Sequence, residues 1–285
     1  DDTALAALGD YTRTIGEVGF DAALRTSGTF DYKNAQWQID GLRHLFTPRI
    51  SYRYIPDADK NLWRFVPIDR LALSSYLPPL GLGDQRGVDD IRASSTLRLA
   101  FDNTLQTRDP QYGSRDLVTL NVADDFYFLH GRPELPTSDI HAELGVQPAR
   151  WLELGVYQRR SAKNLAAEEF NTSVTLRDGD RWRLRFANNF FHDWHTYDPR
   201  YLGGGVRGEA IQDYSLDGRV RLHERFEALT KLHYDARKRR FTEQSYGLAQ
   251  NLDNTWRVAY VVSLFEGRAR ESRFDFRLQV DAIGF

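Results

Sequence analysis

The dominant feature of the chain is a strict alternation of apolar and polar residues, repeated from one end to the other. In residues 42–54, every second position carries Leu42, His44, Phe46, Pro48, Ile50, Tyr52 and Tyr54. The intervening positions of that run carry several arginines. The same alternation returns in residues 96–105, 181–186, 211–222, 255–264 and 273–280. A period of two predicts β-strands with one apolar and one polar face.

Turn signals separate these runs. Asp178-Gly179-Asp180 is a tight hairpin signal, and Pro148-Ala149-Arg150 breaks the chain between two runs. We therefore expect an all-β protein of about 12–14 strands, joined mostly as antiparallel hairpins. A parallel α/β fold is excluded, because no long amphipathic helix alternates with the strands. Residues 57–93 and 191–210 form two long connections that contrast with the short turns.

Two classes of all-β protein fit this pattern. Short turns at one end and long loops at the other are typical of an outer-membrane β-barrel. A soluble β-sandwich also gives alternating strands. The pattern favours an antiparallel transmembrane β-barrel, because many runs are long, carry aromatic residues near their ends and have a densely charged opposite face. The soluble alternative stays open.

Composition narrows the possible functions. The chain has 38 Lys and Arg against 40 Asp and Glu, so it has no global basic field for nucleic acid. It has no cysteine, which removes disulfides, thiolate metal sites and cysteine nucleophiles. No apolar run is long enough for a transmembrane helix. Because the chain begins at Asp1 without a signal segment, we expect a processed protein or a piece of a longer one.

Motifs for catalysis are weak. His192 and His195 have the spacing of metal ligands, but histidines in a long loop are the simpler interpretation. Gly203-Gly204-Gly205 lacks the Lys-Ser/Thr that completes a phosphate loop. Asp124 and Asp125 are adjacent, and neighbouring strand residues face opposite sides of a sheet. The sequence thus predicts a protein that is not an enzyme and has no metal or cofactor.

The arginines form the main candidate constellation. Alternation places a set of them on one side of the sheet, where they would face a polar lumen: Arg43, Arg49, Arg53, Arg98, Arg183, Arg185, Arg219 and Arg221. The first interpretation is a solvated wall in which arginine pairs with Asp and Glu. The second is a polar path for phosphorylated lipid head groups, since arginine binds phosphate through two parallel hydrogen bonds.

Four segments, at residues 46–56, 87–108, 223–265 and 273–280, together resemble the LptD (OstA, organic solvent tolerance) family, outer-membrane proteins of lipopolysaccharide assembly. FTPRISYRYIP, residues 46–56, is similar to a family strand that precedes a long loop. GVDDIRASSTLRLAFDNTLQTR, residues 87–108, resembles the entry to the next strand. Gly87, Asp89 and Ile91 match there, whereas Asp90 replaces the usual arginine and Ser94 or Ser95 the usual asparagine. Residues 223–265 and RFDFRLQV, residues 273–280, resemble the penultimate hairpins and the closing strand.

The resemblance implies that residues 1–285 are a single region, the C-terminal half of a larger barrel without the family's periplasmic domain. The usual outer-membrane C-terminal pattern fits Phe285 and Ile283 but not Asp281 and Gln279. We therefore expect the last strand to end near Val280, with residues 281–285 as a tail or bulge.

The implied function is insertion of lipopolysaccharide into the outer leaflet of a bacterial outer membrane. The implied partners are lipopolysaccharide, an LptE-like plug lipoprotein, the barrel-assembly machinery, outer-membrane lipid and, through the absent N-terminal part, the periplasmic Lpt bridge proteins. In the family, acyl chains leave through a lateral gate between the first and last strands. The gate strand expected here has Phe274, Phe276, Leu278 and Val280 toward lipid, and Asp275, Arg277 and Gln279 toward the lumen. A passive porin-like channel would share every pattern above and is the alternative function, and a soluble all-β binding protein is the third.

Overall fold

The computed structural model describes residues 14–56, 77, 80–84, 93–109, 113–128, 139–162, 164–192, 195–196, 206–207, 210–252, 255–266 and 273–282. The described residues are almost entirely β-strand, with one short 3-10 turn at Leu82–Asp84. None of the described residues form a helix of the length and apolar character needed to cross a membrane.

The strands follow one another along the chain with no α-helix between them in the described residues. Their bounds are β1 Val18–Ala23, β2 Thr26–Asn34, β3 Ile39–Ile55, β4 Ser94–Asp109, β5 Gly113–Tyr127, β6 Asp139–Ala149, β7 Leu152–Ser161, β8 Ala167–Asp178, β9 Trp182–Phe191, β10 His195–Thr196, β11 Val206–Arg207, β12 Ile211–His223, β13 Phe226–Asp235, β14 Arg240–Leu252, β15 Trp256–Phe265 and β16 Phe274–Ala282.

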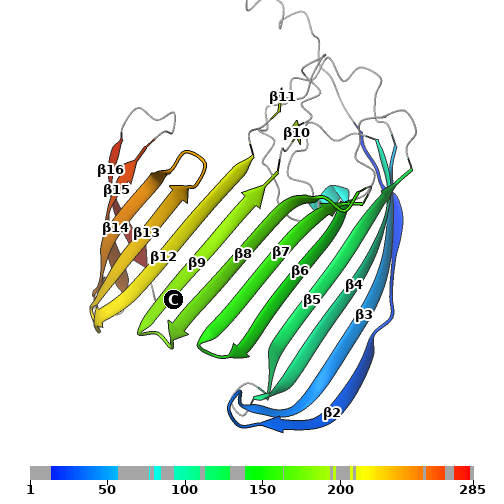
Figure 1. Cartoon of the computed structure of the whole chain (residues 1–285), viewed down its shortest axis with the longest axis horizontal. Coiled ribbons are helices and arrows are strands. Elements are labelled where there is room, and N and C mark those ends of the chain that lie inside the picture. The colour runs from blue at the N-terminus through cyan, green and yellow to red at the C-terminus, as the bar shows by residue number, and fades with distance from the viewer. Residues whose placement is uncertain are drawn as a thin grey trace, which may run out of the picture.

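These strands form one curved antiparallel sheet of 14 strands, in which most strands pair with the next one along the chain (Figure 1). The strands β10 and β11 pair only with each other. The all-β class, the antiparallel hairpins and the strand number agree with the sequence prediction. The sheet is not closed into a barrel, however. Within the described residues, β1 and β2 lie at one edge, β16 lies at the other, and the two edges do not pair.

At the first edge, β1 and β2 lie along β3 as one long strand that is interrupted opposite Pro48 of β3. Val18 of β1 pairs with Tyr54, and Thr26 of β2 pairs with Phe46, so the register does not shift between β1 and β2. Between these pairs, the Leu24 amide donates to the Pro48 carbonyl at 3.1 Å. Because proline has no N–H to return a bond, the ladder breaks there although the strand direction continues.

The two ends of the sheet differ in the length of their connections. At the short-turn end, shown at the bottom of Figure 1, the longest connection between described strands runs only from Asn34 to Ile39. The Asp178–Trp182 hairpin predicted from Asp-Gly-Asp is among these turns, and its Gly179 has the left-handed φ of 49°. At the other end, the predicted long connections follow Ile55 and Phe191.

The end of the last strand differs from the prediction. The strand continues past Val280, because Asp281 pairs with Arg257 and Ala282 with Trp256. Asp281 has the alternation phase of the polar face, which makes a charged residue compatible with a continued strand. Residues 283–285 of the expected tail lie outside the described residues, as do Gly87, Asp89, Asp90 and Ile91 of the family-like segment.

Candidate functional site: the polar face of the sheet

The sheet separates its side chains into a polar face and an apolar face. Residues paired across neighbouring strands share a face, and alternate residues of one strand change face. We call the side that carries Arg49, Arg98 and Asp125 the polar face. Most of the tightly packed side chains lie on this face, for example Ala123, Asp125, Tyr157, Ala187 and Ser245. The crowding is that of the inner side of a curved sheet.

The apolar face is exposed to an unusual degree for a folded protein. One row of directly paired apolar residues crosses seven strands: Val118, Val146, Leu154, Val174, Phe186, Leu216 and Leu232. Phe186 is 44% exposed, and Phe276 on β16 is 56% exposed. A contiguous apolar surface of this extent marks a membrane or a protein partner.

On strands β4 to β8, the polar face is held together by ion pairs. Arg98 binds Asp125 through two nitrogens, with the Nε–Oδ1 distance 2.6 Å and the Nη2–Oδ2 distance 2.7 Å. Arg159 lies 2.8 Å from Asp139 and 3.6 Å from Glu169, whose residue exposure is 0%. We call these five residues the paired wall. Two-nitrogen arginine–carboxylate contacts fix the geometry of both side chains and so join neighbouring strands.

Arginines also tie the short turns of these strands to one another. Arg150 donates to both carboxylate oxygens of Asp109, at 2.8 and 2.7 Å. Arg115 donates to the carbonyl oxygens of Gln147 and Trp37, at 2.9 and 3.1 Å. Donors from arginine side chains therefore satisfy backbone acceptors at the rim of the sheet.

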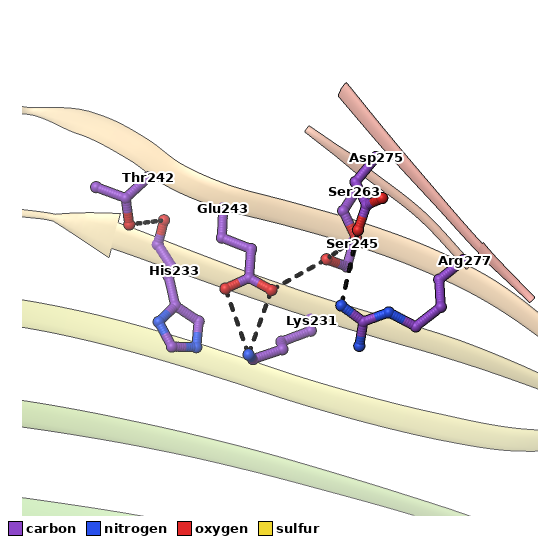
Figure 2. A network of polar contacts seen from close by, with 8 residues as sticks. All are labelled: Lys231, His233, Thr242, Glu243, Ser245, Ser263, Asp275 and Arg277. Carbon is purple, nitrogen blue, oxygen red and sulfur yellow. Dashed lines mark hydrogen bonds and ion pairs between the residues drawn. The ribbon is translucent and has the colours of Figure 1, made fainter. Parts of the chain in front are cut away.

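A third polar network lies on strands β13 to β15 (Figure 2). Lys231 Nζ lies 3.2 Å from Glu243 Oε1, and the hydroxyl of Ser245 donates to the same oxygen at 3.2 Å. Ser245 and Ser263 join through their hydroxyl groups at 2.8 Å. On β16, Asp275 pairs within its own strand with Arg277 at 3.7 Å.

Between these two paired regions lies a concentration of arginine. Arg183 is directly opposite Arg177 on β8 and Arg219 on β12. Arg185 and Arg221 belong to the same part of the polar face, and we call these five residues the arginine cluster. Among the residues that the structure describes, Arg183, Arg185 and Arg221 form no ion pair and no side-chain hydrogen bond, although Asp217 lies opposite Arg185.

The other two members have weak or neutral partners. Arg219 Nε lies 3.9 Å from Glu227, whose carboxylate accepts a shorter bond, of 2.8 Å, from Arg257. Arg177 donates to the backbone oxygen of Arg150. Like charges directly opposite each other in a sheet are destabilising. The arginine cluster is therefore an excess of positive charge that the described part of the chain does not neutralise.

A hollow of about 470 Å³ lies on the polar face beside the arginine cluster and is bordered by Arg185. Its floor is a row of small residues paired across five strands: Thr119, Gly145, Gly155, Ser173 and Ala187. Little room exists for larger floor residues, since a Cβ on Gly145 would lie 2.6 Å from Thr119 Oγ1 and one on Gly155 2.8 Å from Ser173 Oγ. Glu143 and Glu153 line the same hollow.

The eight arginines predicted from the sequence fall into two groups, those that pair with a carboxylate and those that form no ion pair among the described residues. Arg49 pairs with Asp102 at 2.8 Å, and Arg53 pairs with Asp21. Arg98 belongs to the paired wall and Arg219 to the weakly paired contact above. Arg43, exposed on β3, has no ion pair among the described residues, like Arg183, Arg185 and Arg221. The structure thus brings four of the eight together in the arginine cluster, namely Arg183, Arg185, Arg219 and Arg221, and leaves the other four on β3 and β4.

The predicted gate residues all lie on the edge strand β16. Phe274, Phe276, Leu278 and Val280 have the apolar phase and are each at least 55% exposed. Asp275, Arg277 and Gln279 alternate with them and pair in register with Ser263, Val261 and Ala259. In the described residues, β15 is the one strand that β16 pairs with.

Sequence reasoning predicted that arginines would pair with Asp and Glu but did not predict which acidic residues would be the partners. Asp125, Asp139 and Glu169 each lie on a strand next to an arginine of the same face, which is a signal that becomes usable only when strand register is known. The opposite facing of Asp124 and Asp125 was correctly predicted, since Asp125 pairs with Arg98 while Asp124 is in register with Ile140. His195 lies in β10, and no group of three or more metal-ligating residues occurs among the described side chains.

No protein-family model matches the chain, and no curated protein matches its sequence.

Proposed function

We propose that this chain forms part of the wall of an outer-membrane β-barrel that inserts lipopolysaccharide into the outer leaflet. The observation that carries the membrane part is the distribution of the two faces. An exposed apolar face opposite a charged, crowded face is the reverse of what a water-soluble sheet needs, and it suits lipid outside and a wet lumen inside.

Strand length and loop asymmetry support the same proposal. A transmembrane β-strand needs about 9–11 residues. The 16 residues of β4 and the 12 of β8 meet that requirement. Short turns at one end and long connections at the other are the arrangement of outer-membrane barrels, with the short turns in the periplasm. An open edge in lipid is not viable, so the two edges would pair with further strands or with each other.

The lipopolysaccharide part rests on the resemblance to the LptD family. The family-like segment FTPRISYRYIP lies almost entirely in β3 and precedes a long connection, and the family-like segment RFDFRLQV lies almost entirely in the edge strand β16. The ion pair between β15 and β16, from Arg257 to Asp281, is long at 3.9 Å, and a weakly joined edge strand suits a lateral gate. The LptE-like plug, the bridge proteins and the assembly machinery are partners under this proposal.

Site-specific photo-cross-linking tests the proposal against a passive channel. The chain is folded in micelles that contain lipopolysaccharide and phospholipid, with a photoreactive residue at Gln279 on the polar face of β16. The matched control places it at Gln250, on the apolar face of β14. We expect Gln279 to capture lipopolysaccharide in preference to phospholipid, and Gln250 to capture both in proportion to their amounts. Equal capture at both positions, together with a stable ion conductance, would instead favour the porin-like channel.

A further inference from the structure

The arginine cluster is positioned to bind an anion. Directly opposite residues in an antiparallel pair have Cβ atoms about 4.5–5.5 Å apart. Arg177, Arg183 and Arg219 are therefore held close together by the backbone, without a carboxylate between them. A doubly charged anion placed over such a row would relieve the repulsion and accept several charge-assisted hydrogen bonds.

The acidic groups around the cluster do not replace this anion. Asp217 lies opposite Arg185 but makes no ion pair with it among the described residues, and Lys231 is opposite Asp217 on its other side. Glu227 is shared by Arg257 and Arg219. The net charge of the described side chains near Arg183, Arg185 and Arg221 is therefore positive.

The adjoining hollow indicates what else the ligand contains. It begins at Arg185 and continues over a floor of glycine, serine and alanine, with Glu153, Asn171 and Asn189 along its sides. Amide and carboxylate groups of this kind bind hydroxyls, and the small floor leaves room for a ring. Phosphate at the arginines and a sugar along the hollow would match the two chemistries.

We propose that the arginine cluster and this hollow bind the phosphorylated sugar head group of a glycolipid, near the short-turn end of the polar face. This deepens the proposed function, on which the lipid part of the inference rests. The phosphate is held by Arg183 and Arg185, with Arg219 and Arg177 on either side of Arg183. The paired wall does not take part, because its arginines already bind carboxylates.

Binding to the whole chain in detergent tests the inference. The probes are a bis-phosphorylated acylated glucosamine disaccharide, the same glycolipid without phosphates, and inorganic phosphate. The test variant is Arg183→Gln with Arg185→Gln. The control is Arg25→Gln with Arg108→Gln, which removes the same charge from two exposed arginines outside the cluster. Because all four side chains are exposed, both variants are expected to fold.

We expect the test variant to bind the phosphorylated glycolipid about 10- to 100-fold more weakly than the control, which is the loss of one or two charge-assisted bonds. Lysine at both positions should restore part of the affinity, since it keeps the charge but loses the two-nitrogen geometry. Removing the phosphates from the glycolipid should abolish the difference between the variants.

Two results would overturn the inference. One is equal binding of the phosphorylated glycolipid by the test and control variants. The other is that inorganic phosphate binds the chain as tightly as the glycolipid does and binds the test variant more weakly. That result would assign the site to free phosphate. Either result leaves the membrane proposal intact if the chain still folds only in detergent. A chain that folds in plain buffer would instead refute the proposed function, whatever the phosphate result.

Discussion

Two regions of the polar face use the same residue type in opposite ways. In the paired wall of β4 to β8, Arg98 and Arg159 each bind carboxylates of neighbouring strands, and Asp125 and Glu169 are almost completely buried. In the arginine cluster of β8, β9 and β12, Arg183 and Arg185 face other arginines or an unbound carboxylate and remain exposed. The first region joins strands, and the second leaves positive charge available for a ligand.

The difference shows that an alternating arginine pattern does not define a function by itself. The position of the acidic residues on the next strand decides whether an arginine is structural or free. In the paired wall, removing one member of an ion pair leaves the other charge buried and unpaired, so mutations there should lower the stability of the fold strongly. A region with excess charge should tolerate the loss of one arginine.

The largest effect is expected from Asp125→Ala in the paired wall. This change leaves the guanidinium of Arg98, whose side chain is 14% exposed, without its two-nitrogen partner. Breaking a buried ion pair costs about 3–5 kcal/mol. Denaturant unfolding in detergent micelles should show a corresponding fall in the free energy of unfolding. A fall below about 1 kcal/mol, the value for exposed pairs, would mean that the wall does not join the strands.

The second-largest loss of stability is expected from a charge placed on the apolar face of β9, the strand that carries Arg183 and Arg185. Phe186→Arg places a cation in the apolar row between Val174 and Leu216. Near the middle of a bilayer this costs about 2–4 kcal/mol, whereas surface substitutions in water usually change stability by less than about 0.5 kcal/mol. The control Arg185→Gln changes the neighbouring residue on the polar face. Equal stability of the two variants in lipid vesicles would contradict a lipid-facing surface.

An intermediate effect is expected at the network of Figure 2. Lys231→Met removes the ammonium group that lies 3.2 Å from Glu243, a carboxylate whose side chain is 10% exposed. Since Lys231 itself is 46% exposed, we expect a loss of about 1 kcal/mol, within the range of partly solvated hydrogen bonds to charged groups. Thermal unfolding in detergent measures it. A loss as large as that of Asp125→Ala would place this region with the paired wall.

The smallest effect, and the one of opposite sign, is expected from Arg183→Gln. Removing the central charge of the row relieves repulsion with Arg177 and Arg219, so stability should stay constant or rise by a few tenths of a kcal/mol. The gain should disappear at high salt, because salt of about 1 M screens charges beyond roughly 3 Å. Thermal unfolding at low and high salt checks both statements. A clear loss of stability would show that Arg183 has a structural partner.

The strands and hairpins could be predicted well from the sequence because their signal is local, whereas closure into a barrel, which the structure does not show, depends on how the two edge strands pair. Alternation in residues 96–105 and 211–222 is produced by β4 and β12 themselves, and Asp-Gly-Asp encodes the turn between β8 and β9. The interruption at Pro48 and the continuation of β16 to Ala282 were not predicted. Both depend on what the neighbouring strand pairs with, which local periodicity does not contain.

The candidate site could be predicted only in part, for the same reason. Alternation placed Arg98 and Arg183 on one face but could not distinguish them. Arg98 pairs because Asp125 lies one strand away in register, and Arg183 does not because Arg219 occupies the equivalent place. The hollow beside the cluster depends on Gly145, Gly155 and Ser173 meeting across three strands, which requires the complete register.

The most direct measurement is whether the purified chain needs a membrane environment to acquire its β-structure. Circular dichroism and heat-modifiable gel mobility would be followed in plain buffer, in detergent and with thin lipid vesicles. We predict β-structure and a mobility shift only with detergent or vesicles, because the apolar face must be covered. A monodisperse β-protein in plain buffer would contradict the membrane proposal and, with it, the function inferred from the LptD resemblance.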